Sequence, residues 1–309
     1  MAKSLITGGA GFIGSHLADL LIEEGDNVVI LDNLSTGSRK NLNPQAKFYE
    51  MDIQDPAVAT VFKEEKPDYV FHLAAQIDVR KSVDDPAEDA RINLLGSLNI
   101  LENAAEQKTK KIIFASTGGA IYGEAESIPT EESYYEKPIS PYGIHKLATE
   151  KSLFFYKKVK GLDYTILRLA NVYGPRQNSS GEAGVVAIFI SKLLQKEQPL
   201  INGDGNQTRD YVFVKDVAKA FILAKNNTES DKFNIGTGVE TSVNETFNKI
   251  VFCLGIEKPR AYQEAKEGEQ KRSCLDFSKA KSELEWRPEY DMERGIQETL
   301  EWFRLNRGE

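Results

Sequence analysis

The chain has 309 residues, of which 40% are hydrophobic and 28% are charged, and its formal net charge is −8. This composition supports one large folded domain, or one domain with a smaller lobe, and excludes a long disordered chain. Basic residues are not clustered beyond short runs such as residues 108–111, and no apolar run reaches the roughly 18–20 residues that span a bilayer. We therefore expect neither a nucleic acid nor a membrane as partner.

Short apolar runs alternate with helical patterns through the first half of the chain. Strands are expected at residues 4–7, 27–32, 69–73, 111–116 and 162–169. Runs such as 69–73 are almost continuously apolar, which is typical of strands buried on both faces. The β-α-β order predicts an α/β fold of the Rossmann type, a doubly wound parallel sheet with helices on both faces. Two long helices are expected at residues 84–106 and 142–158.

The character of the sequence changes after Gly174 and Pro175. Loop signals occur at residues 178–181 and 202–206, and residues 286–303 read as a packed helix after Pro288. We therefore expect a Rossmann domain at 1–175. Residues 176–309 should form mainly a smaller C-terminal lobe, from which some segments return to the Rossmann domain.

Glycines at positions 8, 11 and 14 follow the first predicted strand and open a helix. This spacing allows a tight turn, close approach of backbone N–H groups to a pyrophosphate, and close helix–strand packing. Asp32 ends the second strand, where a carboxylate accepts hydrogen bonds from an adenosine ribose and repels a 2′-phosphate, which favours NAD over NADP. The alternative for Asp32 is a turn residue that caps the loop at 33–35.

Tyr142 and Lys146 lie four residues apart in a predicted helix and so share one face. A tyrosine has an ordinary pKa of ~10, and making it a base at neutral pH requires a shift of ~3 units, or about 4 kcal/mol. A nearby ammonium group and a positive nicotinamide ring both stabilise a phenolate. Downstream of a dinucleotide-binding pattern, this pair predicts a catalytic base and its partner.

At this point the sequence resembles the extended short-chain dehydrogenase/reductases, in particular the UDP-galactose (UDP-glucose) 4-epimerases. The resemblance runs over nearly the whole chain and is carried by residues 8–14, 31–34, 51–53, 73–75, Asn93, 142–146, 168–174 and 209–211. It implies NAD-dependent inversion of C4 of a UDP-hexose, by removal and return of a hydride through a 4-keto sugar. Residues 1–175 would then bind NAD and residues 176–309 mainly the UDP-sugar.

The resemblance also implies roles for single residues. Tyr142 would be the base, Lys146 would hold the nicotinamide ribose and lower the pKa of the tyrosine, and Thr117 and Ser116 would complete the catalytic set. The cofactor-binding set would be Gly8, Gly11, Phe12, Ile13, Gly14, Asp32, Asn33, Ser35, Thr36, Gly37, Asp52, Ile53, Leu73, Ala74, Ala75, Gln76, Asn93, Tyr142 and Lys146. The substrate-binding set would be Thr117, Tyr142, Asn171, Arg176, Arg209, Lys266, Glu269 and Ser273.

Two arginines in the substrate set have alternatives. For Arg209 the diphosphate grip, to which a guanidinium fork is suited, competes with a surface ion pair to Asp210. Arg176 is either a substrate contact or a solvated loop charge.

Four positions depart from the family pattern. Gly118 stands where a serine or threonine usually helps to move the proton, and we expect Thr117 to take that role because two glycines let the backbone shift. Lys266 replaces a second diphosphate arginine, Asn202 replaces a bulkier residue near the base, and Ile77 replaces a lysine.

The family resemblance and the departures leave several functions open. Ser273 aligns with a residue beside the 2-substituent of the sugar, and its small side chain predicts that UDP-GlcNAc is accepted as well; the alternative is an unrelated turn. A UDP-glucuronate 4-epimerase stays possible. A 4,6-dehydratase or a decarboxylase would need a carboxylate near Gly118 and Gly119, and a non-catalytic NAD-binding module would usually lose Tyr142 or Lys146.

The three scattered histidines and the two cysteines, Cys253 and Cys274, lack metal-ligand spacing, so no metal is expected. His72 reads as a hydrogen-bonded core residue. A strand pattern begins directly after Lys3, which leaves no room for a signal peptide and favours the cytoplasm. The helices at 84–106 and 142–158 would pair with a second copy in a homodimer, or else simply face the sheet.

Overall fold

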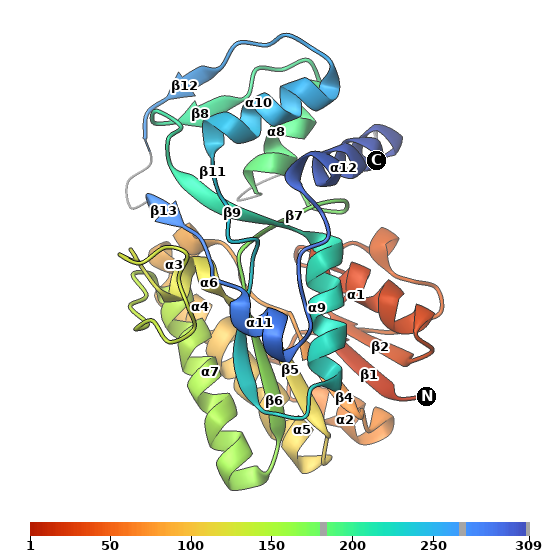
Figure 1. The fold of residues 1–309 in the computed structure, drawn as a ribbon. Helices are drawn as coiled ribbons and strands as arrows, with labels where there is room; N and C mark the ends of the chain where they lie inside the picture. The colour runs from red at the N-terminus through yellow and green to blue at the C-terminus, as the bar shows by residue number, and fades with distance from the viewer. Residues whose placement is uncertain (180–183, 266–269, 307–309) are drawn as a thin grey trace.

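The computed structural model describes residues 1–179, 184–265 and 270–306 (Figure 1). Its strands are β1 (Lys3–Thr7), β2 (Asn27–Asp32), β3 (Lys47–Glu50), β4 (Tyr69–His72), β5 (Lys111–Thr117), β6 (Asp163–Leu169), β7 (Asn171–Tyr173), β8 (Leu200–Asn202), β9 (Thr208–Phe213), β10 (Asp231–Ile235), β11 (Glu240–Ser242), β12 (Ala261–Gln263) and β13 (Arg272–Ser273).

The helices fall between these strands. They are α1 (Phe12–Glu23), η1 (Arg39–Asn41), α2 (Val58–Glu65), α3 (Val79–Asp84), α4 (Pro86–Ala90), the π-helical segment η2 (Arg91–Gly96), α5 (Ser97–Glu106), α6 (Gly118–Ile121), α7 (Pro141–Lys160), α8 (Val185–Leu194), α9 (Val214–Asn226), α10 (Val243–Leu254), α11 (Ser278–Glu283) and α12 (Met292–Leu305).

Among the described residues the main sheet has the strand order β10-β6-β5-β4-β1-β2-β3, and every neighbouring pair is parallel. The predicted Rossmann-type fold and its five predicted strands are therefore confirmed. Sequence patterns missed β3, a short edge strand with only two aromatic residues between two charged ones, and β10, which lies in the second half of the chain.

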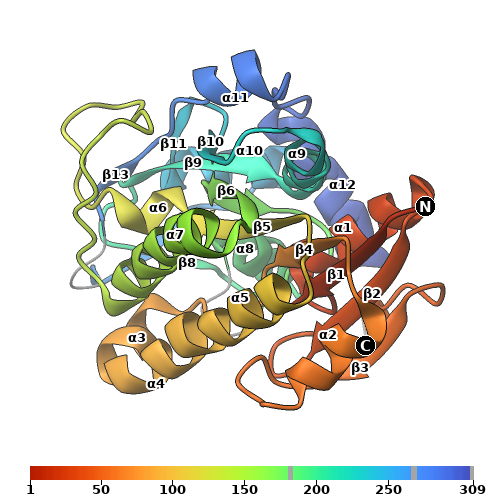
Figure 2. The ribbon, with the colours of Figure 1, turned by 90° about the horizontal axis from the view of Figure 1, so that it is seen from below.

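Helices cover both faces of this sheet (Figure 2). One face packs against α1 and α9 through Leu17, Leu21, Val217 and Phe221. The other packs against α2, α5 and α7 through a set that includes Phe62, Ile100, Leu101, Leu153 and Tyr156. Strands covered on both faces bury every side chain, which explains their nearly continuous apolar runs.

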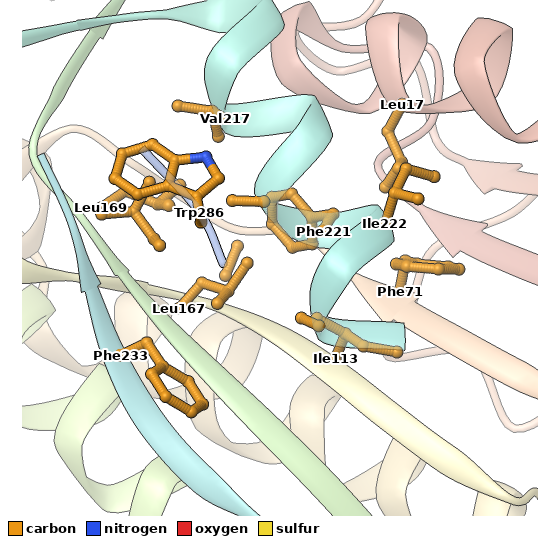
Figure 3. Packing of buried hydrophobic residues seen from close by; sticks show 14 of the residues in the cluster. Leu17, Phe71, Ile113, Leu167, Leu169, Val217, Phe221, Ile222, Phe233 and Trp286 are labelled. Atoms are coloured by element: carbon orange, nitrogen blue, oxygen red, sulfur yellow. The ribbon is translucent and has the colours of Figure 1, made fainter. Parts of the chain in front are cut away.

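The second half of the chain completes the first unit. Helix α9 lies on the sheet and β10 pairs with β6. Trp286 is 1% exposed and packs with Phe221, Leu167 and Leu169 between α9 and the sheet (Figure 3). Its indole N–H donates to the carbonyl of Asp216 at 2.9 Å, so the buried ring keeps its polar group satisfied.

A smaller lobe lies above the carboxyl edge of the main sheet (Figure 1). Its core joins α8, α10 and α12 through Phe189, Phe247 and Leu300. Its central strand β9 pairs with β7, β11 and β13, so residues from distant parts of the chain meet beside one strand. The expected helix at 286–303 is α12, which begins at Met292.

The expected helix at 84–106 is present as α4, the π-helical segment and α5 in succession. In the described part of the chain, no helix is both long and apolar enough to cross a membrane. Across the same residues, no group of three or more His, Cys, Asp or Glu side chains is arranged to hold a metal ion.

Candidate active site

The turn between β1 and α1 is built on glycines that permit close backbone contact. Gly8 has φ +73°, and a Cβ atom there would lie 2.7 Å from the backbone nitrogen of Ala74. A Cβ at Gly14 would lie 2.2 Å from the carbonyl oxygen of Gly8. A side chain at either glycine would push these segments apart. The two glycines therefore allow the turn to lie close to α1 and to the loop after β4.

The N-terminus of α1 is open to an anion. Gly11 is its N-cap, and among the described residues no side chain caps this end and no acidic residue stands in the first turn. The backbone N–H groups of Phe12, Ile13 and Gly14 therefore carry the positive end of the helix dipole without a side-chain acceptor. This arrangement fits a dinucleotide pyrophosphate.

Asp32 lies at the carboxyl end of β2 and is 7% exposed. One carboxylate oxygen accepts from the Ala10 N–H at 3.0 Å, and the other from the Leu34 N–H at 2.8 Å. Burial raises its pKa and these two hydrogen bonds lower it. The turn-capping role considered for Asp32 is therefore present, and the same contacts hold the carboxylate beside the glycine turn, where a ribose would lie.

The loop after β2 meets the loop after β3. Asn33 donates to Asp52 at 2.7 Å and accepts from the Ser35 N–H at 3.0 Å. Thr36 and Gly37 complete the loop, and a Cβ at Gly37 would lie 3.0 Å from Asp32. Ile53 is buried against Gly96 of the π-helical segment. The residues expected on the adenosine side are thus brought together.

The loop after β4 is held by Asn93. The Asn93 amide accepts from the Gln76 N–H at 2.9 Å and donates to the Gln76 carbonyl at 2.8 Å, so it binds the loop as a neighbouring strand would. Ala74 donates its N–H to the Thr7 hydroxyl at 3.2 Å. Leu73 and Ala74 therefore lie next to the glycine turn.

The catalytic candidates lie at the start of α7. Ser140 caps the helix by accepting from the Gly143 N–H at 3.2 Å, and Pro141 takes the first position. A Cβ at Gly143 would lie 2.8 Å from the carbonyl oxygen of Ala120. The glycine after Tyr142 therefore lets the first turn of α7 approach α6, the short helix that follows β5.

Lys146 is buried one turn further along α7. Its ammonium donates to the carbonyl of Ala115 at 2.9 Å and lies 4.7 Å from the centre of the Phe114 ring. Burial lowers the pKa of Lys146 to about 8, while the carboxylates of Asp89 and Glu150 raise it. The amine thus faces the carboxyl end of β5 in an apolar setting.

Tyr142 shares a side-chain hydrogen bond with Thr117. Burial raises the pKa of Tyr142 well above its ordinary value, Asp89 raises it further, and the Thr117 hydrogen bond lowers it. Burial and the Asp89 carboxylate outweigh the Thr117 hydrogen bond, so the net pKa of Tyr142 is raised and the lowering expected from Lys146 is not observed.

The two glycines after Thr117 have different surroundings. A Cβ at Gly118 would lie 2.4 Å from a methyl group of Leu275, so Leu275 occupies the place of a side chain there. A Cβ at Gly119 would lie 3.8 to 4.0 Å from the polar oxygens of Asn171, Thr117 and Ser273. Gly119 therefore borders a space that three polar side chains share.

Ser116 does not join this group. It is 4% exposed and donates to Glu150 at 2.6 Å. Glu150 also accepts two hydrogen bonds from Arg168, at 3.0 and 2.6 Å. Alternation along β5 turns Ser116 and Thr117 to opposite faces of the sheet, so the catalytic role expected for Ser116 is corrected to one in this buried ion cluster.

The substrate candidates gather around β9. Arg209 lies opposite Ser273 of β13 in the register, and Asn171 of β7 pairs with Tyr211. Asp210 is 1% exposed and accepts hydrogen bonds from Thr237, Gly238 and Leu275. Because neighbouring residues of a strand point to opposite faces, Arg209 points away from Asp210, which weakens the ion-pair alternative.

Other expected contacts lie elsewhere. Arg176 pairs with Asp19 of α1 at 2.8 Å, which holds its charge against that helix and corrects its expected substrate role. Lys266 and Glu269 lie outside the described residues. Asn202 accepts from Gln263, and Ile77 is 63% exposed.

Two residues near Tyr142 and Lys146, Asp89 and His145, were not predicted as site residues because no local sequence pattern marks them. Asp89 is 1% exposed, and its carboxylate lies 2.6 Å from the imidazole Nδ1 of His145. His145 is next to Lys146 in the sequence, but its partner lies 56 residues away. His72 is a hydrogen-bonded core residue as predicted, with Thr7 at 2.7 Å and Ser97 at 2.8 Å.

Comparison with known proteins agrees with this geometry. A "Putative UDP-glucose 4-epimerase" of Methanocaldococcus jannaschii is 48% identical over 302 residues, which cover 98% of each chain. A crystal structure of the UDP-glucose 4-epimerase of Thermotoga maritima with UDP-glucose is 49% identical with a TM-score of 0.97, covering 98% of this chain and 99% of that one.

A third relative differs in the sugar. The UDP-N-acetylglucosamine 4-epimerase of Methanobrevibacter ruminantium, solved with UDP-N-acetylmuramic acid, is 36% identical with a TM-score of 0.94 and covers 98% of both chains. Residues 4–236 match the NAD dependent epimerase/dehydratase family. The chain belongs to the NAD-dependent epimerase/dehydratase family.

Proposed function

We propose that this chain interconverts the C4 epimers of a UDP-hexose, UDP-galactose and UDP-glucose, with NAD as its cofactor. The observation that carries the proposal is the hydrogen bond between Tyr142 and Thr117 at the carboxyl end of β5, one helical turn from the buried Lys146. The glycine turn and the loop after β4 lie along the same edge of the sheet, where Rossmann folds bind their ligands.

The chain offers an NAD site in two parts. Phe12, Ile13 and Gly14 present N–H groups to the pyrophosphate, and Asp32 presents its carboxylate to the adenosine ribose. Asn33, Ser35, Thr36, Gly37, Asp52 and Ile53 would surround the adenosine, and Leu73, Ala74, Ala75, Gln76 and Asn93 the nicotinamide side. When bound, NAD supplies a hydride acceptor for C4 and a positively charged ring.

The chain itself handles the proton. Tyr142 takes the proton of the 4-hydroxyl group as the phenolate and returns it when the 4-keto sugar is reduced on its other face. Thr117 donates a hydrogen bond to the phenolate and so favours the ionised form. Lys146 places an ammonium beside the site, and it stays largely protonated below its pKa of about 8.

The substrate lobe would hold the UDP-sugar. Arg209 offers a guanidinium fork to the diphosphate, and Asn171 lies beside Thr117 and Gly119. Ser273 faces the same space with a small side chain, so an N-acetyl group at C2 has room. We therefore expect UDP-GlcNAc to be epimerised as well, since the similar Methanobrevibacter protein is named a UDP-N-acetylglucosamine 4-epimerase.

The assembly proposed is a homodimer formed by α5 and α7. Each helix buries one stripe on the sheet, yet α7 and the π-helical segment before α5 also expose apolar side chains. The exposed residues, each 50–61% exposed, are Leu95, Ile144, Phe154, Phe155 and Val159. A second copy would remove this surface from water. The two free cysteines agree with a reducing cytoplasm.

One assay tests the function. Purified protein is incubated without added NAD with UDP-galactose, UDP-GlcNAc and UDP-glucuronate in turn, and the products are separated by anion-exchange chromatography. We expect UDP-glucose from UDP-galactose and UDP-GalNAc from UDP-GlcNAc. A 4-keto-6-deoxy sugar would show a dehydratase, and a product from UDP-glucuronate alone would overturn the assigned substrate.

A further inference from the structure

A buried carboxylate outside the proposed proton path joins three elements beside Tyr142. Asp89 of α4 is 1% exposed. One of its oxygens accepts from Gln76 at 2.8 Å and from Asn93 at 2.9 Å, and the other lies 2.6 Å from the Nδ1 of His145. A carboxylate only accepts hydrogen bonds, so the imidazole nitrogen is the donor.

These three donors come from the parts of the site that must keep their relative positions. Gln76 belongs to the loop after β4, Asn93 to the π-helical segment, and His145 to the first turns of α7. The carbonyl of Asn93 also accepts from Thr149 of α7 at 3.1 Å. π-helical turns are rare and occur frequently at functional sites. The contacts of Asn93 tie this one to both the loop after β4 and α7.

The charge of Asp89 also acts on the catalytic candidates. Lys146 is faced by Asp89 from α4, by Glu150 from α7, by His72 from β4, and by Phe114 and the Ala115 carbonyl from β5. His72 stays neutral because burial lowers its pKa to about 3. The negative charges facing the ammonium are therefore those of Asp89 and Glu150.

We propose that Asp89 is a positioning residue for the epimerase reaction. Its carboxylate holds the cofactor loop and the catalytic helix in one arrangement through Gln76, Asn93 and His145, and its charge balances the ammonium of Lys146. This inference rests on the proposed function, because it assigns Asp89 a task only if Tyr142 and Lys146 do the chemistry.

The first test is the pH profile of kcat/KM of the holoenzyme with Asp89→Asn. The profile reports ionisations of the free enzyme, with NAD retained. The carboxylate raises the pKa of both Tyr142 and Lys146, so its removal lowers both. Both limbs should move to lower pH, each by about 1 unit, the smaller end of what a nearby charge does. The control is Glu88→Gln, whose carboxylate pairs with Arg91 at the surface.

The second test separates the hydrogen bond from mere packing. His145→Asn keeps a donor close to the place of Nδ1, whereas His145→Ala removes it. We expect the asparagine variant to retain kcat within a few-fold, and the alanine variant to lose roughly 10-fold or more, as a misplaced catalytic group does. If Asp89→Asn does not fold, this pair decides.

The outcomes separate the proposed function from the role of Asp89. Tyr142→Phe at full activity would overturn the proposed function itself. An inactive Tyr142→Phe together with an Asp89→Asn profile that keeps both limbs in place would overturn only the role of Asp89. Equal activity of His145→Ala and His145→Asn would do the same, while a shifted profile and rescue by asparagine support the proposal.

Discussion

Gly118 is expected to be required by Leu275 rather than by the reaction. A Cβ at position 118 would lie 2.4 and 2.8 Å from the two methyl carbons of Leu275, which is 1% exposed and belongs to the main core. Overpacking such a site costs about 1–3 kcal/mol. The loss of unfolded-state entropy on replacing glycine returns only about 0.4–1 kcal/mol. Gly118→Ala should therefore lower the free energy of unfolding by about 1–2 kcal/mol.

Urea denaturation of Gly118→Ala, Gly119→Ala, Leu275→Ala and the double variant of Gly118 and Leu275 tests this steric explanation. Gly119→Ala is the matched control, because a Cβ there meets its neighbours at 3.8 Å or more and should leave stability within about 1 kcal/mol. In the double variant Gly118→Ala with Leu275→Ala the clash is gone, so the two single effects should fail to add by about 1 kcal/mol or more. Additive effects, or a Gly118→Ala protein as stable as the parent, would refute the steric explanation.

Three further predictions concern the site and its core. Thr117→Val should lower kcat by roughly 10- to 100-fold while Thr117→Ser keeps most of it, because only the hydroxyl supports the Tyr142 phenolate; equal rates would contradict this. Ser273→Tyr should lower the kcat/KM ratio of UDP-GlcNAc to UDP-galactose by about 10-fold or more, and an unchanged ratio would separate Ser273 from the sugar. Burial lowers the pKa of His72 from 6.5 to about 3, so its contribution to stability is present above pH 6.5 and is lost as the pH falls toward 3. Between pH 7 and pH 5, the free energy of unfolding from urea denaturation should therefore fall by about 2 kcal/mol more for the parent than for His72→Gln. An equal fall in both proteins would contradict this.

Local patterns predicted those parts of the fold that local physics dictates. Apolar runs gave the central strands because both faces of the sheet are covered, and the spacing of Gly8, Gly11 and Gly14 gave the turn because a Cβ at Gly8 or Gly14 would strike backbone atoms. The edge strand β3 was missed since its half-exposed residues lack such a run.

Long-range contacts account for the rest. The Gly118 departure makes sense only with Leu275, which lies 157 positions further along the chain, and no spacing rule connects the two. The pairing of Arg176 with Asp19 depends on how the chain crosses α1, which the local sequence does not reveal. A substrate role for Arg176 was therefore a reasonable expectation. Alternation along β5 could have separated Ser116 from Thr117 in advance, since neighbouring strand residues face opposite ways. The Asp89–His145 contact joins two helices whose packing no local pattern reveals.

The most direct test of the central claim compares the parent with Tyr142→Phe in the conversion of UDP-galactose to UDP-glucose, followed by NMR, at matched NAD content. If the Tyr142 phenol moves the proton of the 4-hydroxyl group, the parent reaches equilibrium and the variant is slower by about 10²- to 10⁴-fold, the usual contribution of a positioned acid–base group. A Tyr142→Phe protein that converts the sugar within a few-fold of the parent rate would contradict the account.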